Sequence, residues 1–145
     1  MSSLVAGFNF TLEKVHSYRN KLEDQLKLEL AKLRHYQEKE QSALKLYQQQ
    51  RDSYLDVNGN LTLNEMLQKE VYLQALDARI ANQKEKVAKV SKQVLQKKEQ
   101  VQSAMKERKI LDRLRERQLN AFKYKEDKKE QKEIDDLAIN RYYKT

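Results

Sequence analysis

The sequence predicts an all-α fold, namely two long helices in an antiparallel coiled-coil hairpin, with helix two longer and projecting past helix one. Three observations lead to this prediction. The 145 residues include no Pro and only two Gly, whereas a compact fold with many turns uses more of both. Charged residues make up 36% of the chain and apolar residues 39%, a balance typical of long helices. Apolar residues also recur every seven positions in the second half, as in a left-handed supercoil.

One segment carries a strong turn signal, Asp56-Val57-Asn58-Gly59-Asn60. Asn and Gly tolerate the positive φ that a tight reversal requires. The next segment, Thr62-Leu63-Asn64-Glu65, has the form of a capping box, which marks the start of a helix. We therefore expect a single coiled-coil domain over residues 1–145, with helix one at about 11–56, a turn at about 57–61 and helix two at about 62–141.

Helix two has the more regular heptad pattern. Its a positions are all apolar over six heptads, and Gln83 and Lys97 interrupt its d positions. The a positions are Met66, Leu73, Ile80, Val87, Val94 and Val101, and the apolar d positions are Leu76, Val90, Ala104 and Leu111.

Helix one has a rougher apolar stripe, which Glu40 and Arg51 interrupt. Phe10 and Val15 have the spacing of a hydrophobic staple around a cap at Thr11. The stripe comprises Leu12, Val15, Leu22, Leu26, Leu30, Leu33, Tyr36, Leu44, Tyr47 and Tyr54.

The unequal helix lengths predict an unpaired end. Because the link is short, the helices must run antiparallel as neighbours. Reflection about Gly59 places Thr11 opposite residue 107, so residues 108–141 have no partner from this chain, about 50 Å of helix. The a series turns polar there, with Arg108 and Arg115 before Phe122. We expect this end to be a docking element.

Catalysis and metal binding have little support. The chain lacks Cys, which excludes thiolate chemistry. His16 and His35 are about 28 Å apart on a straight helix and cannot share a metal ion. The Asp56–Asn60 segment is a poor calcium loop, because its Gly is at the fourth position and the twelfth is Leu67. We expect no enzyme activity, no metal and no cofactor.

The net charge of +8 suits an acidic partner. Residues 106–132 contain eleven basic and six acidic residues. Nucleic-acid-binding helices carry few acids among their cations, so the mixed composition favours a solvated face or a protein partner. The eight tyrosines include Tyr54 and Tyr72 near the reversal, where seam packing and protein contact are both open.

Met1 to Phe10 contains neither the basic nor the apolar region of a signal peptide. No stretch approaches the roughly 20 apolar residues of a membrane span. We expect a cytoplasmic protein.

Four stretches resemble the FliJ family of the bacterial flagellar type III export apparatus, over nearly the whole chain. Phe8–Val15 is similar to the family's F-x-F-x-L-x-x-V opening, with His16 where Leu is common. Tyr72–Ile80 is similar to its Y-L-x-x-L-x-x-x-I segment. Glu107–Leu114 and Glu130–Ala138 are similar to its E-R-K-x-L-x-x-L and E-x-K-x-x-D-x-L-A patterns.

This resemblance implies a non-enzymatic component of flagellum biogenesis and motility, similar to the central stalk of rotary ATPases. Such a protein binds the hexameric export ATPase and the cytoplasmic domain of the export gate, and family members also bind export chaperones. It is peripheral at the cytoplasmic face of the membrane. A related injectisome stalk, a general export chaperone and a basic nucleic-acid-binding coiled coil remain alternatives.

The polarity of the hairpin assigns two sets of contact residues. For the gate end these are Tyr54, Tyr72 and Leu76. For the ATPase end they are Arg108, Arg115, Arg117, Lys123, Lys125, Leu137 and Arg141.

Overall fold

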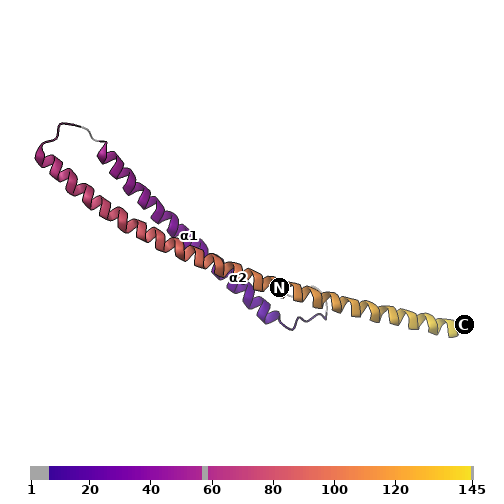
Figure 1. Cartoon of the computed structure of the whole chain (residues 1–145). Helices are drawn as coiled ribbons and strands as arrows, with labels where there is room; N and C mark the ends of the chain where they lie inside the picture. The colour runs from indigo at the N-terminus through magenta and orange to yellow at the C-terminus, as the bar shows by residue number, and fades with distance from the viewer. Residues whose placement is uncertain (1–6, 57–58, 145) are drawn as a thin grey trace. The chain divides into compact units, whose positions relative to one another are not determined.

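The computed structural model describes residues 7–56 and 59–144, with side chains to 143. It contains two helices, α1 (Glu13–Leu55) and α2 (Leu63–Lys144), which pack against each other, and α2 is the longer (Figure 1). This confirms the predicted fold class. The predicted turn residues Val57 and Asn58 lie outside the described residues.

The chain divides into two compact units. One combines Met1–Asp24 with Ser103–Thr145, and the other is Gln25–Gln102. Each unit contains part of α1 and the part of α2 that packs on it. A single domain over residues 1–145 stays a prediction.

The start of α2 has the predicted capping box. The Glu65 amide donates to Thr62 Oγ1 at 3.2 Å, and the Thr62 amide donates to Glu65 Oε2 at 3.3 Å. Two amide donors that the helix itself leaves unsatisfied are thus paired.

The start of α1 differs from the prediction. The helix begins at Glu13, and the Glu13 amide donates to the Phe10 carbonyl at 3.1 Å. Phe10 is buried and its ring lies 6.2 Å from that of His16, whereas Val15 is exposed. The predicted staple between Phe10 and Val15 is therefore wrong, because the side chain of Val15 points away from the seam.

The heptad of α2 forms the core of the hairpin. Its a and d positions from Leu73 to Phe122 are buried or half-buried, so the α2 pattern is confirmed, except that Met66 is exposed. The buried apolar residues of α2 are Leu76, Ile80, Val90, Val94, Val101 and Ala104.

The seam of α1 needs a correction. Tyr36 is exposed, and Gln37 and Glu40 lie at the seam instead. Alternating steps of three and four residues connect the seam positions, and Tyr36 does not fit this spacing. The positions are Glu23, Leu26, Leu30, Leu33, Gln37, Glu40, Leu44, Tyr47, Arg51 and Tyr54, all buried or half-buried.

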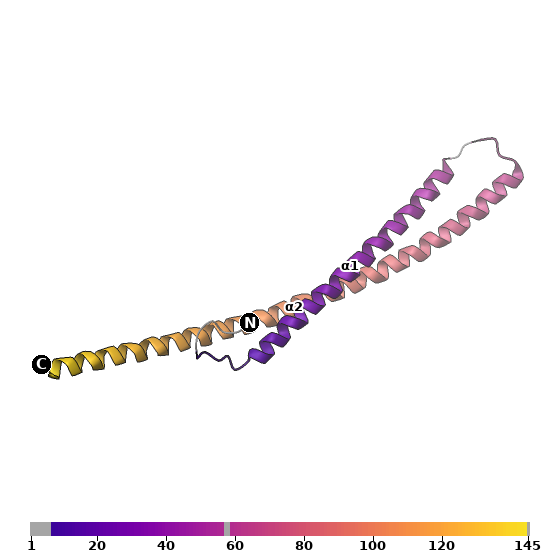
Figure 2. The same ribbon diagram turned by 180° about the vertical axis from the view of Figure 1, so that it is seen from behind.

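The register of the hairpin also differs from reflection about Gly59. Reflection places residue 67 opposite Arg51, but Arg51 Nε donates to Asp77 Oδ1 at 2.6 Å, ten residues further along α2. The first turns of α2 therefore extend beyond the end of α1, as both views show (Figures 1 and 2). Residues 56–62 connect the two helix ends, and a seven-residue link reaches about 23 Å when extended.

Polar seam residues explain why this register is preferred. Reflection would place Glu40 opposite Ala78, where its carboxylate would have no partner. In the structure the Gln83 amide donates to the Glu40 carbonyl at 2.9 Å and to its carboxylate. Lys97 Nζ likewise donates to Glu29 Oε2 at 2.8 Å. Burial of unpaired polar groups costs free energy, so the chain aligns where these side chains find partners.

Candidate functional site

The first section of α1 is joined to α2 by charged pairs. Glu23, only 3% exposed, accepts a hydrogen bond from Arg108, which also donates to Asp112 Oδ2 at 2.6 Å. The hydrogen bond to Glu23 raises the pKa of Arg108, so this guanidinium stays charged. Arg108 was predicted to contact a partner protein, and the structure places it in these two pairs within the hairpin. Reflection about Gly59 did not predict these pairs because it ends the paired region at residue 107.

Two more ion pairs and a contact between a histidine and a carboxylate continue this section. Arg19 donates to Glu107, and the His16 ring lies 2.5 Å from Asp112 Oδ1. Burial acts to raise the pKa of Asp112, but the hydrogen bond from His16 and the charge of Arg108 outweigh burial and lower this pKa. The last layer is Arg115 and Glu13, at 3.6 Å. We call residues 13–24 of α1 and residues 107–115 of α2 the ionic section.

Phe8 extends the paired region beyond the helical part of α1. Its ring centroid lies 5.7 Å from that of Phe122, and the guanidinium of Arg115 is 6.0 Å from the Phe8 ring centre. Gly7 has φ of 83°, a conformation that L side chains rarely adopt. Arg115 lies between Glu13 and Phe8 and is half-buried. Like Arg108, it is less exposed than the sequence predicted.

The side chains of α2 change from partly buried to fully exposed positions after Phe122. All described side chains of residues 123–143 are exposed. Figures 1 and 2 show the yellow end of α2 without a neighbouring segment. These residues form about 30 Å of helix. They include four of the residues predicted for the ATPase end, Lys123, Lys125, Leu137 and Arg141, and the fifth exposed residue, Arg117, lies just before them.

At the other end of the hairpin the two predicted tyrosines meet. The ring centroids of Tyr54 and Tyr72 are 4.4 Å apart, and Lys69 Nζ lies 5.9 Å from the Tyr54 ring centre. Tyr72 is exposed and Tyr54 is half-buried. An apolar hollow of about 440 Å³ lies beside them, lined by Leu46, Gln49, Gln50, Ser53, Tyr54 and Tyr72.

Leu76, the third residue predicted for the gate end, has a different place. It is 2% exposed, so its side chain packs in the seam between α1 and α2. Little of its side chain is therefore available at the surface, and its contact with a partner stays a prediction. Its position at d in the heptad already indicated burial.

The first turns of α2 carry exposed apolar side chains. The heptad pattern placed one of them, Met66, in the seam, and none was predicted as a contact residue. They lie beyond the Tyr54–Tyr72 pair, where α1 has ended. Clustered exposed apolar residues are typical of protein contact surfaces. These residues are Leu63, Met66, Leu67 and Val71.

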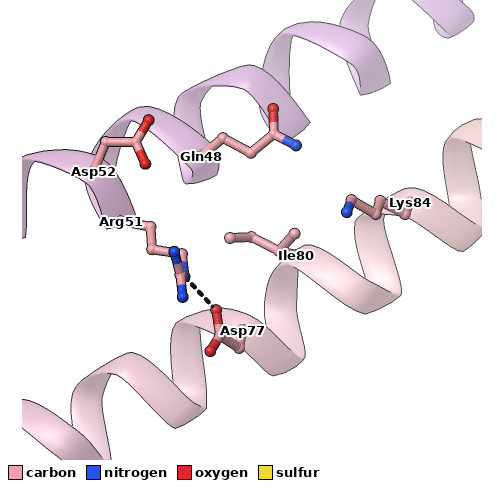
Figure 3. A pocket seen from close by; sticks show the side chains of 6 residues that line it. All are labelled: Gln48, Arg51, Asp52, Asp77, Ile80 and Lys84. Carbon is pink, nitrogen blue, oxygen red and sulfur yellow. Dashed lines mark hydrogen bonds and ion pairs between the residues drawn. The ribbon is translucent and has the colours of Figure 1, made fainter. Parts of the chain in front are cut away.

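A polar hollow of about 400 Å³ lies between α1 and α2 near this end (Figure 3). Arg51 and Asp77 pair across it, and Lys84 reaches toward it from the next turns of α2. Gln48, Asp52 and Ile80 complete its lining. Its charges of both signs fit a solvated gap in the seam.

Residues 7–56 and 59–144 contain no helix long and apolar enough to cross a membrane. In the same described part of the chain, no three His, Cys, Asp or Glu residues group to hold a metal ion.

A protein-family model described as "Flagellar FliJ protein" matches residues 8–145. Comparison with curated proteins and with solved structures gives no match.

Proposed function

Because the chain belongs to the FliJ family of non-enzymatic flagellar export components, we propose that it is a stalk-like link between the hexameric export ATPase and the export gate. The exposed part of α2 after Phe122 binds the ATPase, and the Tyr54–Tyr72 end binds the cytoplasmic domain of the gate. These contacts hold the protein at the cytoplasmic face of the membrane.

The single observation that carries the ATPase assignment is the run of exposed residues 123–143. A helix without a packing partner is marginal in water, so a helix of this length gains stability when it enters a protein partner. Lys123 and Lys125 provide cations, and Leu137 and Ile139 provide exposed apolar side chains.

The opposite end supports the gate assignment by its chemistry. Tyr72 is an exposed aromatic residue beside an apolar hollow, and aromatic residues are enriched at protein interfaces. Leu63 and Met66 extend the apolar surface over the first turns of α2.

We expect the two ends to be separable by substitution. The variant that combines Lys123→Glu with Lys125→Glu should bind the export ATPase at least about tenfold more weakly than the wild type, because it places two carboxylates at a cationic surface. It should bind the gate domain as the wild type does. The variant that combines Tyr54→Ala with Tyr72→Ala should bind the gate domain more weakly and the ATPase as the wild type does. Surface plasmon resonance with each purified partner measures both affinities.

Circular dichroism controls for folding, since both variants should keep the helical signal of the wild type. Loss of both affinities in one variant, or of neither, would contradict the division between the two ends. Binding of many denatured proteins with weak salt dependence would favour a general chaperone instead.

A further inference from the structure

A second stripe of side chains follows α2 beside the ionic section and continues past it. Its members are separated by alternating steps of four and three residues, the spacing of a helix-packing seam. At about 100° per residue, this stripe lies roughly a quarter turn or more from the seam that faces α1. The stripe consists of Ile110, Leu114, Arg117, Ala121, Tyr124 and Lys128, and we call it the second face.

The second face is open within the described structure. Ile110 is 64% exposed and Tyr124 is 61% exposed, and Leu114 is half-buried. A shallow hollow of about 280 Å³ lies over Ile110 and Leu114, between Arg113 and Arg117. The second face therefore combines apolar side chains with cations along the helix surface.

Charge is segregated around this part of α2. Lys106, Arg113 and Lys125 flank the second face, whereas the acidic residues between positions 112 and 130 fall on the other side of the helix. Glu107 lies at the edge and is paired with Arg19. Arg113 and Arg117 form no ion pair with the described residues. Residues 106–132 are therefore mixed in overall composition but present a cationic face when they are placed around the helix.

We propose that the second face binds an amphipathic helix of a partner protein that carries an apolar stripe flanked by carboxylates. The four-three spacing fits a helix, since such a stripe matches one helical neighbour along its length. The cations on both sides require acidic flanks on the partner. A second copy of this chain is disfavoured because each copy carries a net charge of +8, and like net charges repel.

The proposal rests on the proposed function, because this face adjoins the part of α2 assigned to the export ATPase. It deepens that assignment by naming which face of α2 is contacted and with what chemistry. The apolar centre and the charged flanks make separate contributions, so each is tested by its own variant.

The face variant Arg113→Glu with Arg117→Glu should bind the purified hexameric export ATPase at least about tenfold more weakly than the wild type. The matched control Lys98→Glu with Lys109→Glu makes the same change in net charge at exposed residues of α2 outside the face. It should bind within about twofold of the wild type. Ile110→Ser, a change at an exposed position, should also weaken binding, by about fivefold.

The outcomes separate this inference from the proposed function. If the wild type does not bind the ATPase, the proposed function fails, and the inference fails with it. If the wild type binds and the face variant binds as the charge-matched control does, the second face is not the contact and the inference alone is overturned. If sedimentation shows a wild-type dimer that the face variant abolishes, the occupant is a second copy and the proposed partner is wrong.

Discussion

Single polar side chains at the seam decide how the two helices align. Glu23 is almost completely buried and binds Arg108, and Glu40 meets Gln83 at a d position. In the reflected register these acids would face Leu95 and Ala78. The correct alignment lies eight to ten residues further along α2, as the Tyr54–Tyr72 and Arg51–Asp77 pairs show. Apolar stripes alone permit several registers, and buried polar pairs select among them.

Replacement of Glu23 tests this selection. Glu23→Ala leaves a half-buried Arg108 without its main partner, so the free energy of unfolding should fall by about 2–3 kcal/mol. The neighbouring Asp24→Ala, at an exposed position, should change it by less than about 0.5 kcal/mol. Urea denaturation followed by circular dichroism measures both. Equal effects of the two variants would show that the Glu23–Arg108 pair does not stabilise the hairpin.

Two carboxylates make the free energy of unfolding depend on pH in the acidic range. A hydrogen bond from Lys97 lowers the pKa of Glu29, and that of Asp112 is lowered by His16 and Arg108 against the effect of burial. A group with a lowered pKa stabilises the fold above its ordinary pKa, here 4.5 for Glu and 3.8 for Asp, and this contribution is lost as the pH falls through the lowered value.

We therefore expect the free energy of unfolding to decrease as the pH is lowered below about 4.5. The double variant Glu29→Gln with Asp112→Asn should begin less stable at neutral pH and lose less on acidification. Glu99→Gln, at an exposed position, should keep the wild-type profile. Thermal unfolding between neutral and acidic pH provides the comparison. Parallel wild-type and double-variant curves would contradict the assignment to these carboxylates.

At the scale of the elements, α1 has two chemically different sections. Residues 13–24 pair with α2 through charges, while the later residues pack on the apolar core that includes Leu76, Val90 and Val101. Partly exposed ion pairs are screened by salt, whereas apolar packing is not weakened in the same way.

High salt should therefore loosen the ionic section selectively. Between low ionic strength and about 1 M sodium chloride, amide hydrogen exchange of residues 13–24 should become faster, while residues 26–47 should keep their protection. Hydrogen-exchange mass spectrometry resolves the two segments. Uniform acceleration along α1, or none, would show that the charged layers do not hold this section.

The elements differ in how far the sequence predicts them. The α2 heptad was predictable because its a positions are apolar over six repeats. In α1, Tyr36 was assigned to the seam and Gln37 was not, because the role of a polar seam residue depends on a partner in the other helix, such as Ser91, which accepts from Gln37 at 3.1 Å. The position of Tyr54 and Tyr72 near the reversal was predictable, but the contact between their rings was not, because reflection about Gly59 places Tyr54 opposite Asn64.

The dependence on a partner in the other helix also explains why two site residues were predicted in the wrong place. Arg108 and Arg115 were expected to be exposed because reflection about Gly59 ends the paired region at residue 107. The true register depends on which side chains of the two helices pair, and the sequence of either helix alone does not show this. The second face was visible in the sequence as a four-three spacing from Ile110 to Lys128, but its charge segregation appears only when residues are placed around a helix.

At the scale of the whole molecule, the chain is a helical hairpin with a longer second helix and a net charge of +8. Its exposed chemistry differs along the sequence, with cations on the later part of α2 and aromatic and apolar groups where the chain reverses. A link between two different proteins requires two such unlike surfaces. An acidic surface on the ATPase is expected from this charge.

The most direct test of the stalk-like role is steady-state ATP hydrolysis by the hexameric flagellar export ATPase, with the full-length protein and with a chain truncated after Phe122. The truncated chain keeps Phe122 and the entire ionic section, and lacks the exposed end of α2. We predict that the full-length protein stimulates hydrolysis and that the truncated chain, still helical and still able to bind the gate domain, does not. Equal stimulation by both chains, or none by the full-length protein with a confirmed hexamer, would contradict this role.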